Sequence, residues 1–334
     1  MALLRRSVGF AGRLFSTTTC RASLAAADDV SKLGPKEVAV QFSAAQVTGT
    51  NEMQSATGVV TAVGSGVTGI AANDTVASVA GVGGAFREVA KVPAGSLLKL
   101  PAGVPPEFGC LLEAPLTAAL LLKDVAAGAT VVQSGAGTPV GQAVVQLAKA
   151  KGIQTVSIVE PHPESEELVK LLKNIGGDIV MPIEFAHSSE FNDLMQDLSK
   201  PTLAIHCIPF LQDPSILKKV PAGAAPYSQW KVVMEDALFE DKRQIKISAT
   251  LAAMSAASVS HGPYAAELPG TAVSAKSVGA KELEAELALV SDLLSSGSMS
   301  LWVESFPPED LKFATETATQ LFHSYRTPVL NFGK

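Results

Sequence analysis

The sequence is poor in cysteine, in aromatic residues and in charge, and each shortage excludes a class of protein. Its 334 residues include 3 cysteines, which are too few and too scattered for a disulfide scaffold or a four-thiolate zinc site. Only 17% of the residues are charged and 47% are hydrophobic, so the chain can bury enough apolar surface to fold. No uninterrupted apolar run reaches the roughly 18 residues of a membrane-spanning helix. The formal net charge of -6 and the lack of a basic stripe argue against binding to nucleic acid.

The N-terminal segment has an unusual composition. The first 27 residues contain four arginines and no acidic residue, and a hydroxyl-rich run covers Ser16–Thr19. Two glycines and Arg13 interrupt the apolar stretch that a secretory signal would need. This composition is typical of a mitochondrial transit peptide. We therefore predict that residues 1–27 are a targeting segment and that the protein lies in the matrix or on the matrix face of the inner membrane.

Two patterns of secondary structure follow each other along the rest of the chain. Up to Val92, short alternating runs are separated by glycine turns, which indicates a small sheet or barrel. From about residue 119, apolar runs alternate with helical patterns, which indicates a doubly wound parallel sheet of the α/β class. We expect strands at 38–42, 58–63, 75–79, 86–92, 129–133, 155–159, 179–180, 203–208 and 328–332, and helices at 111–122, 142–151, 166–173, 281–295 and within 308–325. Residues 252–278, rich in Ala, Ser, Gly and Pro, are expected to form a surface insertion.

A glycine-rich turn between an expected strand and an expected helix is a candidate phosphate-binding site. It contains Gly135, Gly137 and Gly141. Unpartnered N–H groups and the helix dipole favour an anion at a helix start, and glycine lets a diphosphate approach the main chain. The spacing is one residue longer than the usual fingerprint, so the strand–turn–helix context supports the site more than the spacing does.

Several sequence blocks, taken in order, carry a resemblance to a known family. The blocks are Ala62–Ile70, Gly83 with Phe86 and Arg87, Leu100 and Pro101, Pro115–Ala118, Val140–Ala148 and Pro328–Phe332. In this order they resemble medium-chain dehydrogenase/reductases, most closely the mitochondrial reductases of trans-2-enoyl thioesters. The resemblance implies a GroES-like barrel beside a Rossmann domain, NAD(P)H in the cleft between them, and usually a dimer. We therefore predict a trimmed GroES-like domain at 36–118 and 299–334, and a Rossmann domain at 119–298.

The family's proton donor has no counterpart in this chain. In the family it is a tyrosine of the barrel domain, whereas the three tyrosines here are Tyr227, Tyr264 and Tyr325, and the first histidine is His162. The segment Ala44–Gly58 is also shorter than the loop that carries the tyrosine. A positioned acid contributes about 10²–10⁴-fold to a rate. Water could still protonate the enolate, so the loss slows reduction without necessarily abolishing it, and we assign no catalytic residue.

The expected cofactor site departs from the family in three places. Pro139 stands where the turn has a glycine; it removes one N–H donor, although proline is also a normal first residue of a helix. Glu160 follows the expected strand at 155–159, the second of the Rossmann part. There it would repel the 2′-phosphate of NADP and favour NAD, or it would simply be a solvated residue at a turn. Ile208–Phe210 and Pro226–Gln229 replace small residues beside the nicotinamide. We expect weak or no NAD(P)H binding, through Gly135, Gly137, Gly141 and Glu160.

No metal site is expected. His206 and Cys207 are adjacent on an expected strand and therefore point to opposite faces. Cys110 has no neighbouring histidine and is expected to pack as a small apolar residue. Glu107 and Glu113 flank an apolar segment, and we expect both on its solvated edge.

Two functional hypotheses from different classes follow. In the first, the protein is a non-catalytic accessory subunit of a larger mitochondrial assembly, such as one of the respiratory chain. It would form a homo- or heterodimer through the Rossmann domain, with edge pairing near Gln244–Leu251. In the second, it is an active NAD(P)H-dependent 2-enoyl thioester reductase of fatty acid synthesis, with Tyr227, Tyr264 or water as the proton source. The missing acid and the altered turn favour the first. A nucleotide-binding sensor without turnover is a third, weaker alternative.

Overall fold

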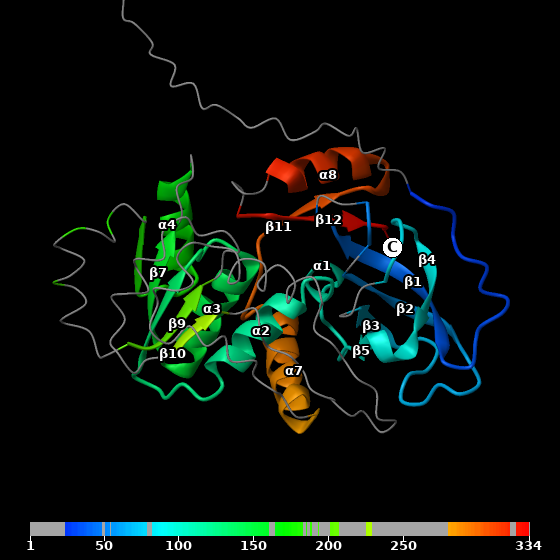
Figure 1. The fold of residues 1–334 in the computed structure, drawn as a ribbon, viewed down its shortest axis with the longest axis horizontal. Coiled ribbons are helices and arrows are strands. Elements are labelled where there is room, and N and C mark those ends of the chain that lie inside the picture. Colours follow the sequence, from blue (N-terminus) through cyan, green and yellow to red (C-terminus); the bar gives the residue numbers. More distant parts are fainter. Residues whose placement is uncertain are drawn as a thin grey trace, which may run out of the picture.

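The computed structural model contains two sheets with helices α2 (Glu113–Leu122) and α7 (Ala280–Ser295) between them (Figure 1). It describes residues 24–48, 51–53, 55–78, 82–159, 164–182, 185, 188, 193, 201–206, 225–228, 280–320 and 325–333. Several sequence predictions concern residues outside this set. They are those on most of the targeting segment (residues 1–23), Glu160, Cys207, Ile208–Phe210, the pairing strand at 244–251, the insertion at 252–278 and Tyr264.

The first sheet has seven strands and combines both ends of the described chain. Its strands are β1 (Glu37–Gln46), β2 (Ala56–Val63), β3 (Thr75–Ser78), β4 (Val89–Pro93), β5 (Leu97–Lys99), β11 (Val303–Phe306) and β12 (Thr327–Asn331). Their order is β11-β12-β1-β2-β3-β5, and β4 pairs with β1. Strand β1 pairs with β4 along its first half and with β12 along its last residues, so one long strand joins all parts of the sheet. The pairing of β1 with β2 has register shifts at Ala39/Val40 and at Phe42/Ala44.

The second sheet is parallel and has five strands. These are β6 (Thr130–Ser134), β7 (Gln154–Val159), β8 (Ile179–Pro182), β9 (Pro201–His206) and β10 (Ala225–Ser228), in the order β10-β9-β6-β7-β8. The first strand in sequence is therefore central, with later strands added on both sides. This is the order of a doubly wound nucleotide-binding sheet, and ligands bind such sheets where the order reverses, at the carboxyl ends of the strands. Here that point lies between β6 and β9.

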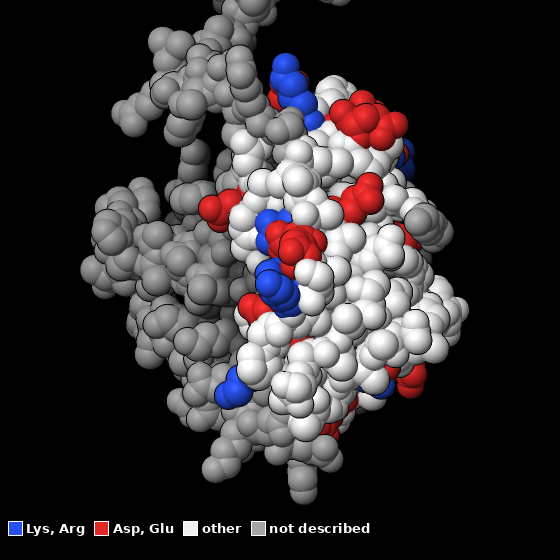
Figure 2. Space-filling view, turned by 90° about the vertical axis from the view of Figure 1, so that its right-hand side faces the viewer, with Lys and Arg blue, Asp and Glu red and all other residues white. Residues whose placement is uncertain are grey.

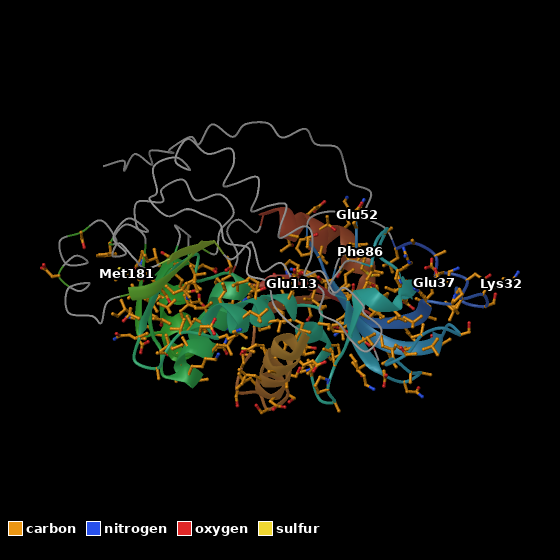
Figure 3. The ribbon with its side chains drawn as sticks, turned by 60° about the horizontal axis from the view of Figure 1, so that its bottom comes forward. Lys32, Glu37, Glu52, Phe86, Glu113 and Met181 are labelled. Carbon is orange, nitrogen blue, oxygen red and sulfur yellow. The ribbon has the colours of Figure 1, made fainter. Side chains whose placement is uncertain are left out.

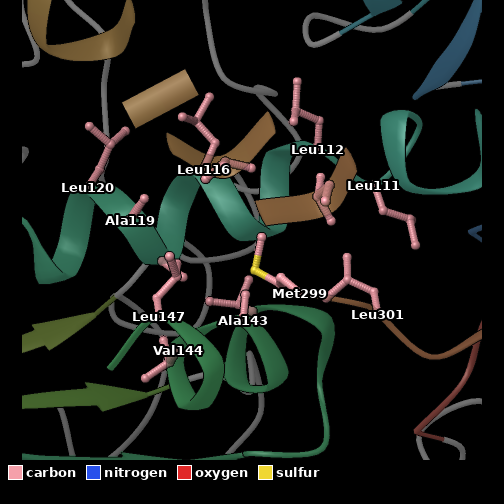
Figure 4. Close-up of a cluster of buried hydrophobic side chains, with 14 of the residues drawn as sticks. Leu111, Leu112, Leu116, Ala119, Leu120, Ala143, Val144, Leu147, Met299 and Leu301 are labelled. Carbon is pink, nitrogen blue, oxygen red and sulfur yellow. The ribbon is translucent and has the colours of Figure 1, made fainter. Parts of the chain in front are cut away.

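The other described helices are α1 (Pro106–Gly109), α3 (Pro139–Lys151), α4 (Ser165–Asn174) and α8 (Leu311–Gln320), with 3₁₀ turns at Ala94–Ser96 and Pro308–Asp310. Helices α3 and α4 pack on the second sheet, α1 and α8 pack on the first, and α2 and α7 lie between the two (Figure 1). Helix α2 is apolar on nearly all sides, because it packs against both α3 and α7. Ala119 of α2 lies beside Leu147 of α3, and Met299 lies beside Ala143, whereas Leu116 and Leu120 point to the other side of α2 (Figure 4). The same buried cluster extends into both sheets and joins the two parts, while a second cluster lies within the first sheet and a third lies beside α4.

The expected α/β class is confirmed, and most expected elements are present. The expected helix at 142–151 begins earlier, at Pro139, and the expected strand at 86–92 begins only at Val89. Phe86 precedes the strand and is fully buried in the core. Strands β5 and β11 were not expected. Both are only three or four residues long and have no clear alternation.

The segment Ala25–Asp28, which spans the predicted end of the targeting segment, lies against β4. The N–H of Ala25 donates to the carbonyl of Phe86 (2.7 Å), and that of Asp28 donates to Val89 (3.0 Å). The Asp28 carboxylate accepts from the N–H of Lys91 at 2.9 Å and lies 3.4 Å from the Arg87 guanidinium. The segment from Ala25 to Asp28 therefore covers β4, and the boundary at residue 27 remains a prediction.

Removing this segment should lower stability. A chain that starts at Val30 loses the two backbone hydrogen bonds and the contacts of Asp28, and such bonds contribute about 0.5–1.5 kcal/mol each. We expect its melting temperature to be roughly 2–6 °C below that of a chain starting at Leu24. Thermal unfolding of the two purified proteins measures this difference. Identical melting temperatures would show that the segment adds nothing to the folded state.

Candidate nucleotide-binding site

The glycine turn lies at the carboxyl end of β6, beside the point where the strand order reverses. Gly135 has a φ of 69°, a left-handed conformation that favours glycine. The N–H of Ala136 donates to the carbonyl of Ile158 in β7 at 3.2 Å, so the turn is anchored to the neighbouring strand. The structure thus brings Gly135, Gly137 and Gly141 together at the expected edge of the sheet.

Helix α3 begins within this turn and is capped by Thr138. The Thr138 hydroxyl accepts a hydrogen bond from the N–H of Gly141 at 3.2 Å and donates to the carbonyl of Gly135 at 2.9 Å. Pro139 is the first helical residue, where a missing N–H costs the helix nothing. Of the two sequence-based interpretations of Pro139, the structure supports the helix-start one for the fold itself.

Two backbone donors of the turn remain available for a ligand. Within the described part of the chain, the N–H groups of Gly137 and Val140 have no hydrogen-bond partner. Both lie at the positive end of α3, where the helix dipole adds to their attraction for an anion. The turn therefore has the donors and the field that a diphosphate requires.

The third glycine allows α3 to pack directly on the turn. A Cβ at Gly141 would lie 2.6 Å from the Cα of Ala136 and 2.7 Å from the carbonyl oxygen of Gly135. From β6, the buried Gln133 donates to the carbonyl of Gly141 at 3.2 Å and to the Ser157 hydroxyl at 2.9 Å. The helix start is thus fixed from the turn and from the sheet.

Aromatic residues from the C-terminal segment adjoin the turn, which sequence patterns did not indicate. A Cβ at Gly137 would lie 3.7 Å from the Cβ of Tyr325, whose ring packs edge-on against Trp302 at 5.4 Å. Burial raises the pKa of Tyr325; Arg326 opposes this effect and Glu167 adds to it. The phenol therefore stays protonated and donates to the Glu167 carboxylate, 3.4 Å away. The guanidinium of the exposed Arg326 lies 5.4 Å from the same ring and adds positive charge near the turn.

The acidic and metal-binding predictions have mixed outcomes. Glu107 and Glu113 are both half-buried, and Glu113 lies where the two parts of the molecule meet (Figure 3). Its Oε1 is shielded from solvent, so the expected position on a solvated edge holds only in part for this residue. Cys110 is buried as expected, and burial raises the pKa of its thiol far above the usual range. The described residues contain no group of three metal-ligating side chains. Tyr227 lies in β10, and Tyr264 lies outside the described residues, so no replacement proton donor is identified.

The surface adds two observations. On the face shown in Figure 2, acidic and basic side chains are mixed among uncharged ones, so this face has no extended basic region. Among the described helices, none is long and apolar enough to cross a membrane.

Comparison with known proteins gives relatives for about half of the chain. A mitochondrial enoyl-[acyl-carrier-protein] reductase of Dictyostelium discoideum is 38% identical over 156 residues, which are 45% of this chain and 45% of the relative. The Homo sapiens protein of the same name is 30% identical over 49% of this chain and 45% of its own length. The chain thus matches about half the length of these curated relatives. No family model matches.

Solved structures share the fold over almost the whole chain. A heterodimeric mitochondrial 2-enoyl thioester reductase from Candida tropicalis has a TM-score of 0.63 at 17% identity, covering 91% of this chain and 93% of that one. An Escherichia coli quinone oxidoreductase, solved with NADPH, has a TM-score of 0.64 at 16% identity, covering 91% and 94%. At these identities the likeness establishes the fold alone: a GroES-like part beside a Rossmann part.

Proposed function

We propose, from the premise that this chain is a homologue of the mitochondrial enoyl-[acyl-carrier-protein] reductases, that it binds NAD(P)H at the glycine turn and reduces 2-enoyl thioesters slowly. The homology and the fold agree with the resemblance seen in the sequence. The location is mitochondrial, since the curated relatives carry that location in their names and the N-terminal composition predicts it independently. The matrix remains the expected compartment.

The geometry of the turn carries this proposal. Gly137 and Val140 have available N–H groups, Thr138 caps the helix, and a side chain at Gly141 would clash with the turn. These three features support occupation of the turn by the diphosphate of a dinucleotide, despite the proline at position 139.

The chain's own residues perform only part of the reaction. Bound NAD(P)H would supply a hydride to the β-carbon of the enoyl group, and the N–H groups of Gly137 and Val140 would hold its diphosphate. The α-carbon then needs a proton. Because no tyrosine or histidine occurs between residues 36 and 118, water is the proton source that we propose. We therefore expect the nucleotide to be positioned correctly but the enoyl group to be reduced slowly.

A second candidate function rests on the same absence. A homologue without the barrel acid could act as an accessory subunit, and the Candida tropicalis structure, a heterodimer of two related chains, supports pairing in this fold. In the proposed pairing the Rossmann part supplies the interface, and the dimer joins a larger mitochondrial assembly such as one of the respiratory chain. This alternative requires no nucleotide.

Titration separates these functions. Purified protein is titrated with NADPH and with NADH, and crotonyl-CoA is then added to follow nucleotide oxidation. Micromolar binding with slow oxidation supports the reductase. Tight binding without oxidation supports the sensor. Absence of binding, together with co-migration in a large assembly on native gels of mitochondria, supports the accessory subunit and contradicts the proposed reductase.

Pro139→Ala tests whether the proline weakens the site. The change adds an N–H at the first position of α3, and a hydrogen bond to a charged group contributes about 1.5–3 kcal/mol. We expect the Kd for NADPH to fall roughly tenfold. The free energy of unfolding should change by less than about 1 kcal/mol, since alanine is compatible with the helix. An unchanged Kd would mean that position 139 does not face the diphosphate.

A further inference from the structure

Gln142 connects the glycine turn with the other part of the molecule. It is fully buried in the first turns of α3. Its Nε2 donates to the carbonyl of Gly137 at 2.7 Å and to the carbonyl of Tyr325 at 2.8 Å. Its Oε1 accepts from the N–H of Trp302 at 2.9 Å. One side-chain amide therefore binds the turn and the two segments that lead into β11 and β12.

Gln146, one helical turn further along α3, provides a natural comparison. Its amide donates to the carbonyl of Ser300 at 2.8 Å and accepts from the N–H of Ser300 at 2.9 Å. Its other hydrogen bond goes to the carbonyl of Gln142 at 3.1 Å. Gln146 therefore holds the segment before β11 as Gln142 does, but none of these hydrogen bonds goes to the turn.

The bond from Gln142 fixes the orientation of one peptide group in the turn. The carbonyl of Gly137 accepts from Gln142, while the N–H of Thr138 in the same peptide group donates to Gly135 at 3.1 Å. Because both ends of this peptide group are hydrogen-bonded, its orientation is fixed. It adjoins the N–H of Gly137, which is one of the two donors that remain for an anion. A buried amide left without hydrogen-bond partners lowers the stability by about 1–3 kcal/mol. The arrangement in which the turn and both C-terminal segments bind Gln142 at the same time is therefore favoured.

We infer that Gln142 is a positioning residue that couples the shape of the glycine turn to the packing of Trp302 and Tyr325. Disturbing the C-terminal segments disturbs the turn through Gln142, and an anion held at the turn strengthens the contacts with those segments. The coupling is reciprocal, as any linkage between two sites must be. The nucleotide part of this inference rests on the proposed function, whereas the coupling itself does not.

Hydrogen exchange of Gln142→Met and Gln146→Met tests the coupling in the nucleotide-free protein. Methionine keeps most of the side-chain volume and removes the hydrogen bonds. Both variants should exchange faster than the wild type at residues 300–302. Only Gln142→Met should also exchange faster, by about tenfold, in the peptide covering 135–141. Equal behaviour of the turn in the two variants, or no change in the turn of Gln142→Met, would overturn the inference.

NADPH titration of the same proteins gives a second readout. In the wild type, NADPH should slow exchange at Trp302, and Gln142→Met should raise the Kd about tenfold, while Gln146→Met leaves it within twofold. An equal rise in both variants would overturn the inference. If the wild type does not bind NADPH at all, the proposed function fails, and the exchange of the free proteins still decides whether Gln142 couples the two regions.

Discussion

Replacing Gly141 with alanine is expected to abolish measurable NADPH binding and to destabilise the protein by about 2 kcal/mol or more. The new Cβ would lie 2.6 Å from the Cα of Ala136 and 2.7 Å from the carbonyl oxygen of Gly135. Both are backbone atoms of an anchored turn, so α3 or the turn must move. Alanine favours a helix over glycine by about 1 kcal/mol, but overpacking of this kind costs about 1–3 kcal/mol or more, and loss of the turn's bonds adds to it.

Gly137→Ala is the matched control for this prediction. Its Cβ would meet the end of the Leu168 side chain at 2.9 Å, and a flexible side chain can move aside. We therefore expect a smaller loss of stability than for Gly141→Ala. Urea unfolding and NADPH titration of both variants measure the difference. A Gly141→Ala protein that is as stable as the wild type, and binds as well, would contradict the close packing of α3 on the turn.

The second large effect concerns turnover. With crotonyl-CoA and NADPH we expect rates about 10²–10⁴-fold below those of a relative that has the barrel tyrosine, because a positioned acid contributes that much. The rate should also lack the decline at high pH that deprotonation of a phenol would cause. Steady-state rates across a pH series, measured beside such a relative, give both quantities.

Tyrosine variants provide the control for this second prediction. Tyr227→Phe, Tyr264→Phe and Tyr325→Phe should each leave the rate within about twofold, if water donates the proton. Tyr325 donates to Glu167 beside the glycine turn, so its loss should affect nucleotide binding more than the chemical step. A fast wild-type rate that collapses in one of these variants would identify the acid and refute its absence.

Local patterns predicted the strand, turn and helix around the glycines, because those contacts lie within a few residues of each other. The sequence predicts the start of α3 three residues too late. A glycine-rich turn does not show that Thr138 caps a helix, and Pro139 can be interpreted either as a lost N–H donor or as the first residue of the helix. Strand β11 is too short to show alternation, and it forms because β12 offers a partner.

The surroundings of the turn could not be predicted in the same way. Gln142 meets Trp302 and Tyr325 across 160 and 183 residues of sequence, and each contact depends on the packing of the two sheets. The burial of one Glu113 oxygen has the same origin, because α2 lies between the two parts of the molecule. The absence of a barrel tyrosine, in contrast, is a property of the sequence and needs no structure to be seen.

Transfer of deuterium from nicotinamide-labelled NADPH to a 2-enoyl thioester measures the proposed chemistry most directly. The purified protein is incubated with each stereospecifically 4-deuterated NADPH and crotonyl-CoA, and the product is analysed by mass spectrometry and NMR. We expect deuterium at the β-carbon from one of the two labelled forms, a solvent proton at the α-carbon, slow formation, and loss of the product in Gly141→Ala. Saturated product that carries no label from either form, or no product from a protein shown to bind NADPH, would contradict the proposal of a slow enoyl thioester reductase.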